Sequence, residues 1–200
     1  MSGAIVREPS RATLYLKGHS GVLVFVLHLV CILGSIALGT TTIHVPWASS
    51  SSAGVIPFNF VFAIALVSSS VVFWENRISV MEENSSQSWV WVDWSFFVIC
   101  LVECGVVAAI GNRGMLQYAL ICFGLLFTAC TVTTLRKSFY AVLLVTAVQC
   151  VLISVLPSRY LPVFWPDSGI VIALAAILST GLFAIVRSSM KRGNSFLGWS

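Results

Sequence analysis

Four polar side chains lie inside long apolar stretches of the sequence: Glu103, Gln149, His28 and, nearer one end of its stretch, Asp93. Polar groups are costly inside hydrocarbon, so they are the first candidates for a functional site. One interpretation makes Glu103 a proton or cation site near the middle of a membrane. The alternative makes it a glutamate that joins two helices by hydrogen bonds. The sequence leaves both interpretations open.

The residues that most often hold cofactors or metals favour packing roles here. His28 is alone among the histidines in lying within an apolar stretch, because His19 and His44 flank the stretches on opposite sides. A haem held by two histidines is therefore not expected. Cys100 and Cys104 share a helix face four residues apart, but a buried cysteine commonly packs as a small hydrophobic residue. We predict no cofactor and no metal site.

The sequence favours a protein that is not an enzyme. It contains no Gly-x-Ser-x-Gly turn, no His-Glu-x-x-His pair and no Gly-rich phosphate loop, so we predict no catalytic residue. The six cysteines all lie in apolar segments rather than in loops, which argues against a disulfide framework or a structural zinc site. These cysteines are Cys31, Cys100, Cys104, Cys122, Cys130 and Cys150.

The composition requires a lipid environment for most of the chain. Of the 200 residues, 58% are hydrophobic and 9% are charged, whereas about a quarter of the residues of a soluble domain are charged. A soluble fold of this size could not cover so much apolar surface. The net charge is +4, but no run of lysine and arginine marks a nucleic-acid site. Membrane lipids are the expected partners, and nucleic acid is excluded.

Six stretches are long and apolar enough to cross about 30 Å of hydrocarbon as helices. The sequence therefore predicts an all-α integral membrane protein, a compact bundle of six transmembrane helices in which short connections make neighbours antiparallel. It divides into a cytoplasmic N-terminal segment (1–20), one transmembrane domain (21–187) and a cytoplasmic tail (188–200). The predicted spans are 21–41, 55–74, 90–111, 116–135, 139–157 and 168–187.

The basic residues predict the sidedness of this bundle. With six spans, nine of the 11 lysines and arginines fall on one side and two, Arg113 and Arg159, on the other. Cytoplasmic segments hold an excess of basic residues, so both the N- and C-termini are predicted to be cytoplasmic. The Trp and Tyr residues lie near span ends, as expected for rings that favour the membrane interface. The sequence does not indicate which membrane holds the protein.

Helical rise predicts how the four polar residues pair. Counted from the cytoplasmic starts of their spans, Asp93 and His28 lie roughly 5 and 10 Å deep, and Gln149 and Glu103 roughly 15 and 20 Å deep. We expect His28 to pair with Asp93 and Glu103 with Gln149. Ser35 with Gly39 has the four-residue spacing of small residues that lets membrane helices approach closely.

Two functions of different classes fit these features. The first is support for the passage of a small solute, ion or proton, with Glu103 as the functional carboxyl group. The second is a non-catalytic assembly or scaffolding subunit, whose polar residues serve only helix packing. A homo-oligomer or a larger membrane complex is the protein partner to expect under the second hypothesis.

Overall fold

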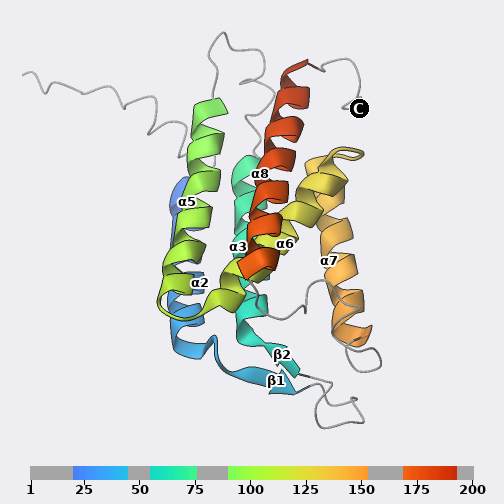
Figure 1. Ribbon diagram of the computed structural model, residues 1–200. Coiled ribbons are helices and arrows are strands. Elements are labelled where there is room, and N and C mark those ends of the chain that lie inside the picture. The colour runs from blue at the N-terminus through green and yellow to red at the C-terminus, as the bar shows by residue number, and fades with distance from the viewer. Residues whose placement is uncertain (1–19, 45–54, 76–89, 153–168, 193–200) are drawn as a thin grey trace, which may run out of the picture.

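The computed structural model describes residues 20–44, 55–75, 90–152 and 169–192, and these residues form six helices and one small sheet (Figure 1). The prediction of a helical fold is confirmed for this part of the chain. The predicted terminal segments, apart from residue 20 and residues 188–192, lie outside the described residues. The helices are α2 (Gly21–Leu38), α3 (Phe58–Trp74), α5 (Val90–Ala109), α6 (Arg113–Cys130), α7 (Leu135–Leu152) and α8 (Gly169–Arg192).

Four helices are long and apolar enough to cross a bilayer: α2, α5, α6 and α7. Each contributes 18 or 19 apolar-rich residues, and 18 residues of helix span about 27 Å. The other two, α3 and the apolar part of α8 (Val171–Val186), are shorter. The fold is therefore compatible with a multi-pass membrane protein.

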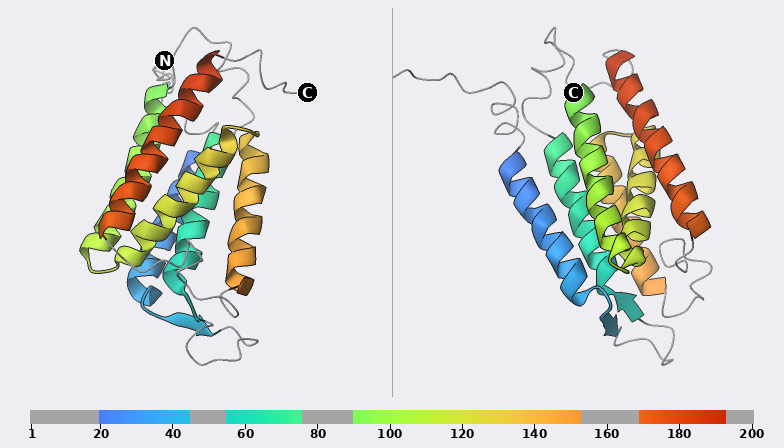
Figure 2. Two further views of the ribbon diagram at one scale, coloured as in Figure 1. Left: turned by 45° about the vertical axis from the view of Figure 1, so that its right-hand side comes forward. Right: turned by 60° about the vertical axis from the view of Figure 1, so that its left-hand side comes forward.

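Successive helices run in opposite directions around a central helix, α6 (Figures 1 and 2). In α6, 61% of the residues are buried, against 22–33% in α2, α5 and α7. It packs against α3, α5, α7 and α8, while α2 lies at the edge against α3 and α5. The start of α2 and the end of α8 lie at the same end of the bundle (Figure 1).

The outer helix faces are apolar and exposed. Val22 on α2, Val102 on α5, Leu144 on α7 and Ile177 on α8 are each more than half exposed. Contiguous exposed apolar surface of this extent is rare on soluble monomers. Lipid is the solvent that these faces suit.

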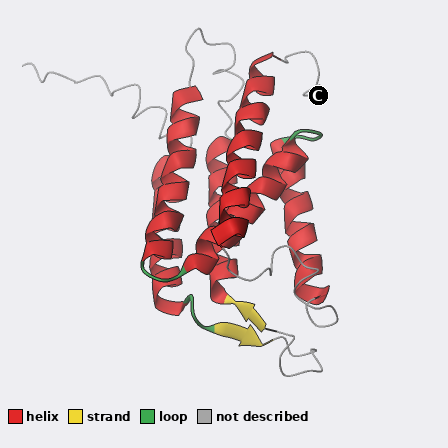
Figure 3. Ribbon diagram, viewed as in Figure 1, coloured by secondary structure: helices red, strands yellow, loops and turns green. Residues whose placement is uncertain are grey.

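A two-stranded antiparallel sheet, which the sequence did not predict, joins α2 to α3 (Figure 3). Strand β1 (Thr42–His44) pairs with β2 (Val55–Pro57), with Ile43 opposite Ile56. The helices on either side are correspondingly shorter than the predicted spans 21–41 and 55–74. Pro57 has an extended backbone (φ −70°, ψ 141°), and α3 begins directly after it.

Two of the later helices, α6 and α7, begin earlier than predicted. Gly111, with φ of 105°, makes the turn that ends α5, so α6 begins at Arg113 rather than at 116. The hydroxyls of Thr131 and Thr133 donate to the carbonyls of Thr128 and Ala129, where α6 ends. The residues between the predicted spans 116–135 and 139–157 were expected to form a connection. They lie instead in the first turn of α7.

An aromatic cluster joins four helices at the end of the bundle where α3 ends and α5 begins. Trp74, the last residue of α3, is partly buried and contacts five phenylalanine rings at centroid distances of 5.6–6.4 Å. Phe97 of α5 stacks on Phe183 of α8 at 4.6 Å. These contacts hold α5 in place beside α3 and α6. The five rings around Trp74 are Phe96, Phe97, Phe123, Phe127 and Phe183.

Candidate functional site

A histidine and a glutamate meet in the interior of the bundle, between α2 and α5. His28 Nδ1 lies 2.7 Å from Glu103 Oε2, a hydrogen-bonding distance that also meets the criterion for an ion pair. The His28 side chain is 1% exposed and that of Glu103 is 17% exposed. The residues are 75 positions apart in the chain, so only the packing of α2 against α5 brings them together.

Ser70 of α3 contacts the other nitrogen of the imidazole ring. Its Oγ lies 3.4 Å from His28 Nε2 and donates its hydrogen to the carbonyl of Leu66 at 2.9 Å. A hydroxyl has one hydrogen to donate, so Ser70 offers only lone pairs to Nε2. His28 therefore contacts a carboxyl group through Nδ1 and a hydroxyl group through Nε2.

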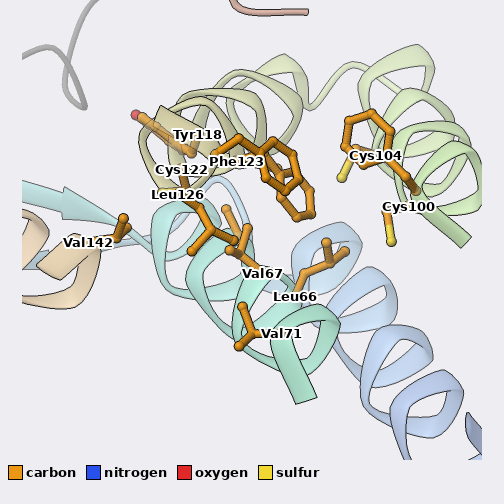
Figure 4. Close-up of a cluster of buried hydrophobic side chains, with 14 of the residues drawn as sticks. Leu66, Val67, Val71, Cys100, Cys104, Tyr118, Cys122, Phe123, Leu126 and Val142 are labelled. Atoms are coloured by element: carbon orange, nitrogen blue, oxygen red, sulfur yellow. The ribbon is translucent and has the colours of Figure 1, made fainter. Parts of the chain in front are cut away.

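Cys100 completes a cluster of four polar side chains from three helices. Its Sγ lies 3.5 Å from Ser70 Oγ, and Cys100 precedes Glu103 by three residues, which puts both on one face of α5. Figure 4 shows Cys100 and Cys104 projecting from α5 toward the bundle interior. The sequence predicted a packing role for Cys100, and the structure adds contact with this polar cluster.

The surroundings of the cluster are apolar. The ring of Phe96 lies 5.5 Å from the imidazole of His28 and stacks on Phe73 at 3.8 Å. Val24 and Cys31, on the same helix as His28, are also buried. Electrostatic interactions are stronger in such a medium, and an unpaired polar group is more costly there.

The predicted pairing of the four polar residues is wrong for His28 and Glu103, which bond to each other rather than to Asp93 and Gln149. The depth estimate assumed that α2 and α5 begin at one level. Figures 1 and 2 show that α5 begins well beyond the start of α2, so its later turns face the middle of α2.

Asp93 and Gln149 are buried but lie away from the pair. Asp93 is in the first turn of α5, ten residues and therefore about 15 Å along the helix from Glu103. Gln149 is on α7, which lies on the opposite side of the bundle from α5 (Figure 1). The structure therefore assigns neither residue to the cluster of His28 and Glu103.

A second polar cluster, which the sequence did not reveal, lies near the C-terminal end of α2. Asn59 of α3 and Asn112 of the α5–α6 turn bond to each other through their amides, and Ser35 Oγ donates to Asn59 Oδ1 at 2.7 Å. Asn112 Nδ2 also donates to the carbonyl of Ser35 at 2.8 Å. Gly39 lies against both amides, so the predicted close approach at Ser35 and Gly39 is confirmed. In the sequence, this cluster could have been indicated by Asn59, which lies at the start of a helix, and by Asn112, which lies in the turn between two helices.

The two clusters differ in what they can do chemically. The asparagine cluster contains no titratable group and joins three segments by hydrogen bonds. The His28 cluster holds a carboxyl group, an imidazole and a thiol, and one donor atom from each of His28, Cys100 and Glu103 lies within 4.8 Å of the others. Such a set can hold a proton or a cation. No family model, curated protein or solved structure matches the chain.

Proposed function

We propose that the chain is a six-span membrane protein that supports the passage of a small cation or proton, with His28 and Glu103 as its interior site. The observation that carries this proposal is the 2.7 Å contact between these two side chains inside an apolar bundle. A buried imidazole and a partly buried carboxyl group from different helices form a site that a cation can enter by displacing a proton. In membrane helices such groups commonly mark ion or proton pathways.

Six crossings are supported by the alternating directions of the helices and by the charges at their ends. Arg136 and Lys137 begin α7 and Arg192 ends α8, all at the end of the bundle where α2 starts (Figure 1). Arg136 Nε donates to Glu75 Oε1 at 2.6 Å at that end. We assign this end, and both termini, to the cytoplasmic side by the excess of basic residues.

Cysteine labelling in sealed vesicles tests these crossings. Five native cysteines are buried and Cys150 is partly buried, so a cysteine introduced into a connection is expected to dominate labelling by a membrane-impermeant maleimide. Ser10→Cys, Ser85→Cys and Ser195→Cys are expected to react from one side, and Ser49→Cys from the other. Labelling of the Ser10 and Ser195 variants from opposite sides would mean an odd number of crossings and contradict the topology.

Flux through reconstituted vesicles tests the function. We expect wild-type vesicles to dissipate an imposed cation or proton gradient, as measured by ion-sensitive dyes in the lumen. Glu103→Gln keeps the size of the side chain but removes its charge, so it is expected to reduce the flux at least tenfold. A loss of 1.4 kcal/mol in binding the moving ion corresponds to that factor.

The matched control is Glu75→Gln, which makes the same change in a glutamate whose side chain is 32% exposed at a helix end. It is expected to leave the flux within about twofold of wild type. Folding of each variant is checked by circular dichroism and size-exclusion chromatography. Wild-type vesicles no more permeable than protein-free vesicles would contradict the proposal and favour the assembly or scaffolding role.

A further inference from the structure

Three side chains that ligate metals converge in the interior of the bundle, although the sequence predicted no metal site. One donor atom each of His28, Cys100 and Glu103 lies within 4.8 Å of the others. They come from the middle of α2 and from two successive turns of α5. Their convergence depends on a helix contact that the sequence spacing did not predict.

We infer that these three residues bind a divalent transition-metal ion of the zinc class, and that this ion is the cation of the proposed function. The inference rests on the proposed function, because that function gives the ion a route through the membrane. Binding of the ion at equilibrium is a separate property, which can be measured without any flux.

The charges of the three ligands match those of a divalent ion. A thiolate and a carboxylate contribute two negative charges and a neutral imidazole contributes none, so a bound divalent cation makes the site neutral. Neutrality matters because an uncompensated charge in an apolar interior is very costly. With the same thiolate, carboxylate and neutral imidazole as ligands, a monovalent ion would leave one negative charge uncompensated.

The exchange with protons also balances. In the uncharged form of the empty site, the Cys100 thiol carries one proton and the His28–Glu103 pair carries another that can leave. One divalent ion replaces these two protons, and the site is neutral before and after binding. No oxidant or reductant is required, because the metal keeps its charge throughout.

The donor types favour zinc over the hard divalent ions. Mg²⁺ and Ca²⁺ take oxygen ligands almost entirely, whereas zinc binds thiolate, imidazole and carboxylate together. Two further thiols, those of Cys31 and Cys104, are buried on the same two helices. The interior around the carboxylate is therefore rich in sulfur, which suits a borderline-soft ion.

The geometry fits tetrahedral coordination after small side-chain movements. Zinc lies about 2.0–2.3 Å from such ligands, so tetrahedral donors are about 3.3–3.7 Å apart. The donors lie within 4.8 Å of one another, so movements on the order of 1 Å bring them to this spacing. The Ser70 hydroxyl contacts two of the three residues, at 3.4 Å from His28 Nε2 and 3.5 Å from Cys100 Sγ.

Equilibrium dialysis of the purified full chain in detergent against Zn²⁺ tests the inference. We expect one Zn²⁺ per wild-type chain in the presence of excess Mg²⁺, and a Kd at least tenfold higher for Cys100→Ala. The matched control is Cys122→Ala, which removes an equally buried thiol from α6 and is expected to bind as wild type. Binding of Co²⁺ supplies a second readout, because a thiolate ligand gives a charge-transfer absorption that Cys100→Ala should lack.

The outcomes separate this inference from the proposed function. Wild-type protein that takes up no Zn²⁺, or Cys100→Ala protein that binds it as tightly as wild type, overturns the metal site. If the metal site is overturned in this way but the vesicles still show a cation flux that Glu103→Gln reduces, the proposed function stands with a different ion. Stoichiometric Zn²⁺ binding that depends on Cys100, in a protein without flux, supports the site and contradicts passage. Glu103→Gln, expected to weaken Zn²⁺ binding at least tenfold, provides a second variant should Cys100→Ala fail to fold.

Discussion

Replacing His28 with alanine is expected to lower the free energy of unfolding of the detergent-solubilised protein by about 2–5 kcal/mol. A hydrogen bond between membrane helices contributes about 0.6–2 kcal/mol. The substitution also leaves Glu103, whose side chain is 17% exposed, without its bonding partner, which adds about 1–3 kcal/mol. Unfolding by a graded denaturant, followed by circular dichroism, measures the difference.

His44→Ala is the control for this change. His44 is exposed on β1, and such surface substitutions usually alter stability by no more than about 0.5 kcal/mol. A His28→Ala effect as small as that of His44→Ala would show that the buried pair contributes nothing to the fold. Glu103→Leu in the His28→Ala background is expected to recover part of the loss, since it removes the unpaired carboxyl group.

Gly39→Ala is expected to destabilise the bundle by about 2–4 kcal/mol. A Cβ at this position would clash with Asn112 Nδ2 and with Asn59 Oδ1. Both contacts would be far closer than van der Waals contact, so the amide pair must separate. The cost combines steric strain of about 1–3 kcal/mol with buried amides that lose their bonds. The same unfolding measurement applies.

Gly105→Ala is the matched control, because a Cβ there meets no atom of the described structure within 4 Å. Gly105 lies inside α5, and alanine favours a helix interior by about 0.5–1 kcal/mol over glycine. This variant is expected to be as stable as wild type or more stable. Equal destabilisation by the two substitutions would mean that the asparagine cluster does not hold α2, α3 and the α5–α6 turn together.

The helices could be predicted from hydrophobic length, but their ends could not. All six apolar stretches contain a helix in the structure, because each is too long and apolar to be a loop. The boundaries differ where a local backbone feature decides them. Pro57 delays the start of α3, and the positive φ of Gly111 ends α5 early enough for α6 to begin at Arg113.

Two of the four predicted site residues lie in the candidate site, and their pairing with each other was not predicted. His28 and Glu103 stood out because polar groups are rare in apolar spans, and both are in the site. Their depths were counted from separate helix starts, and the offset between α2 and α5 arises from tertiary packing that no single segment encodes. Cys100 was missed as a partner for the same reason, although its three-residue spacing from Glu103 put the two on one helix face.

The central claim, that His28 and Glu103 act together as the site of cation passage, is tested most directly by exchanging them. The measurement is flux through vesicles that contain His28→Glu, Glu103→His or both substitutions in one chain, at equal amounts of folded protein. The account predicts at least a tenfold loss for each single substitution and recovery of most of the flux in the double variant. Wild-type flux in the single variants would contradict it, as would a folded double variant no more active than either single one.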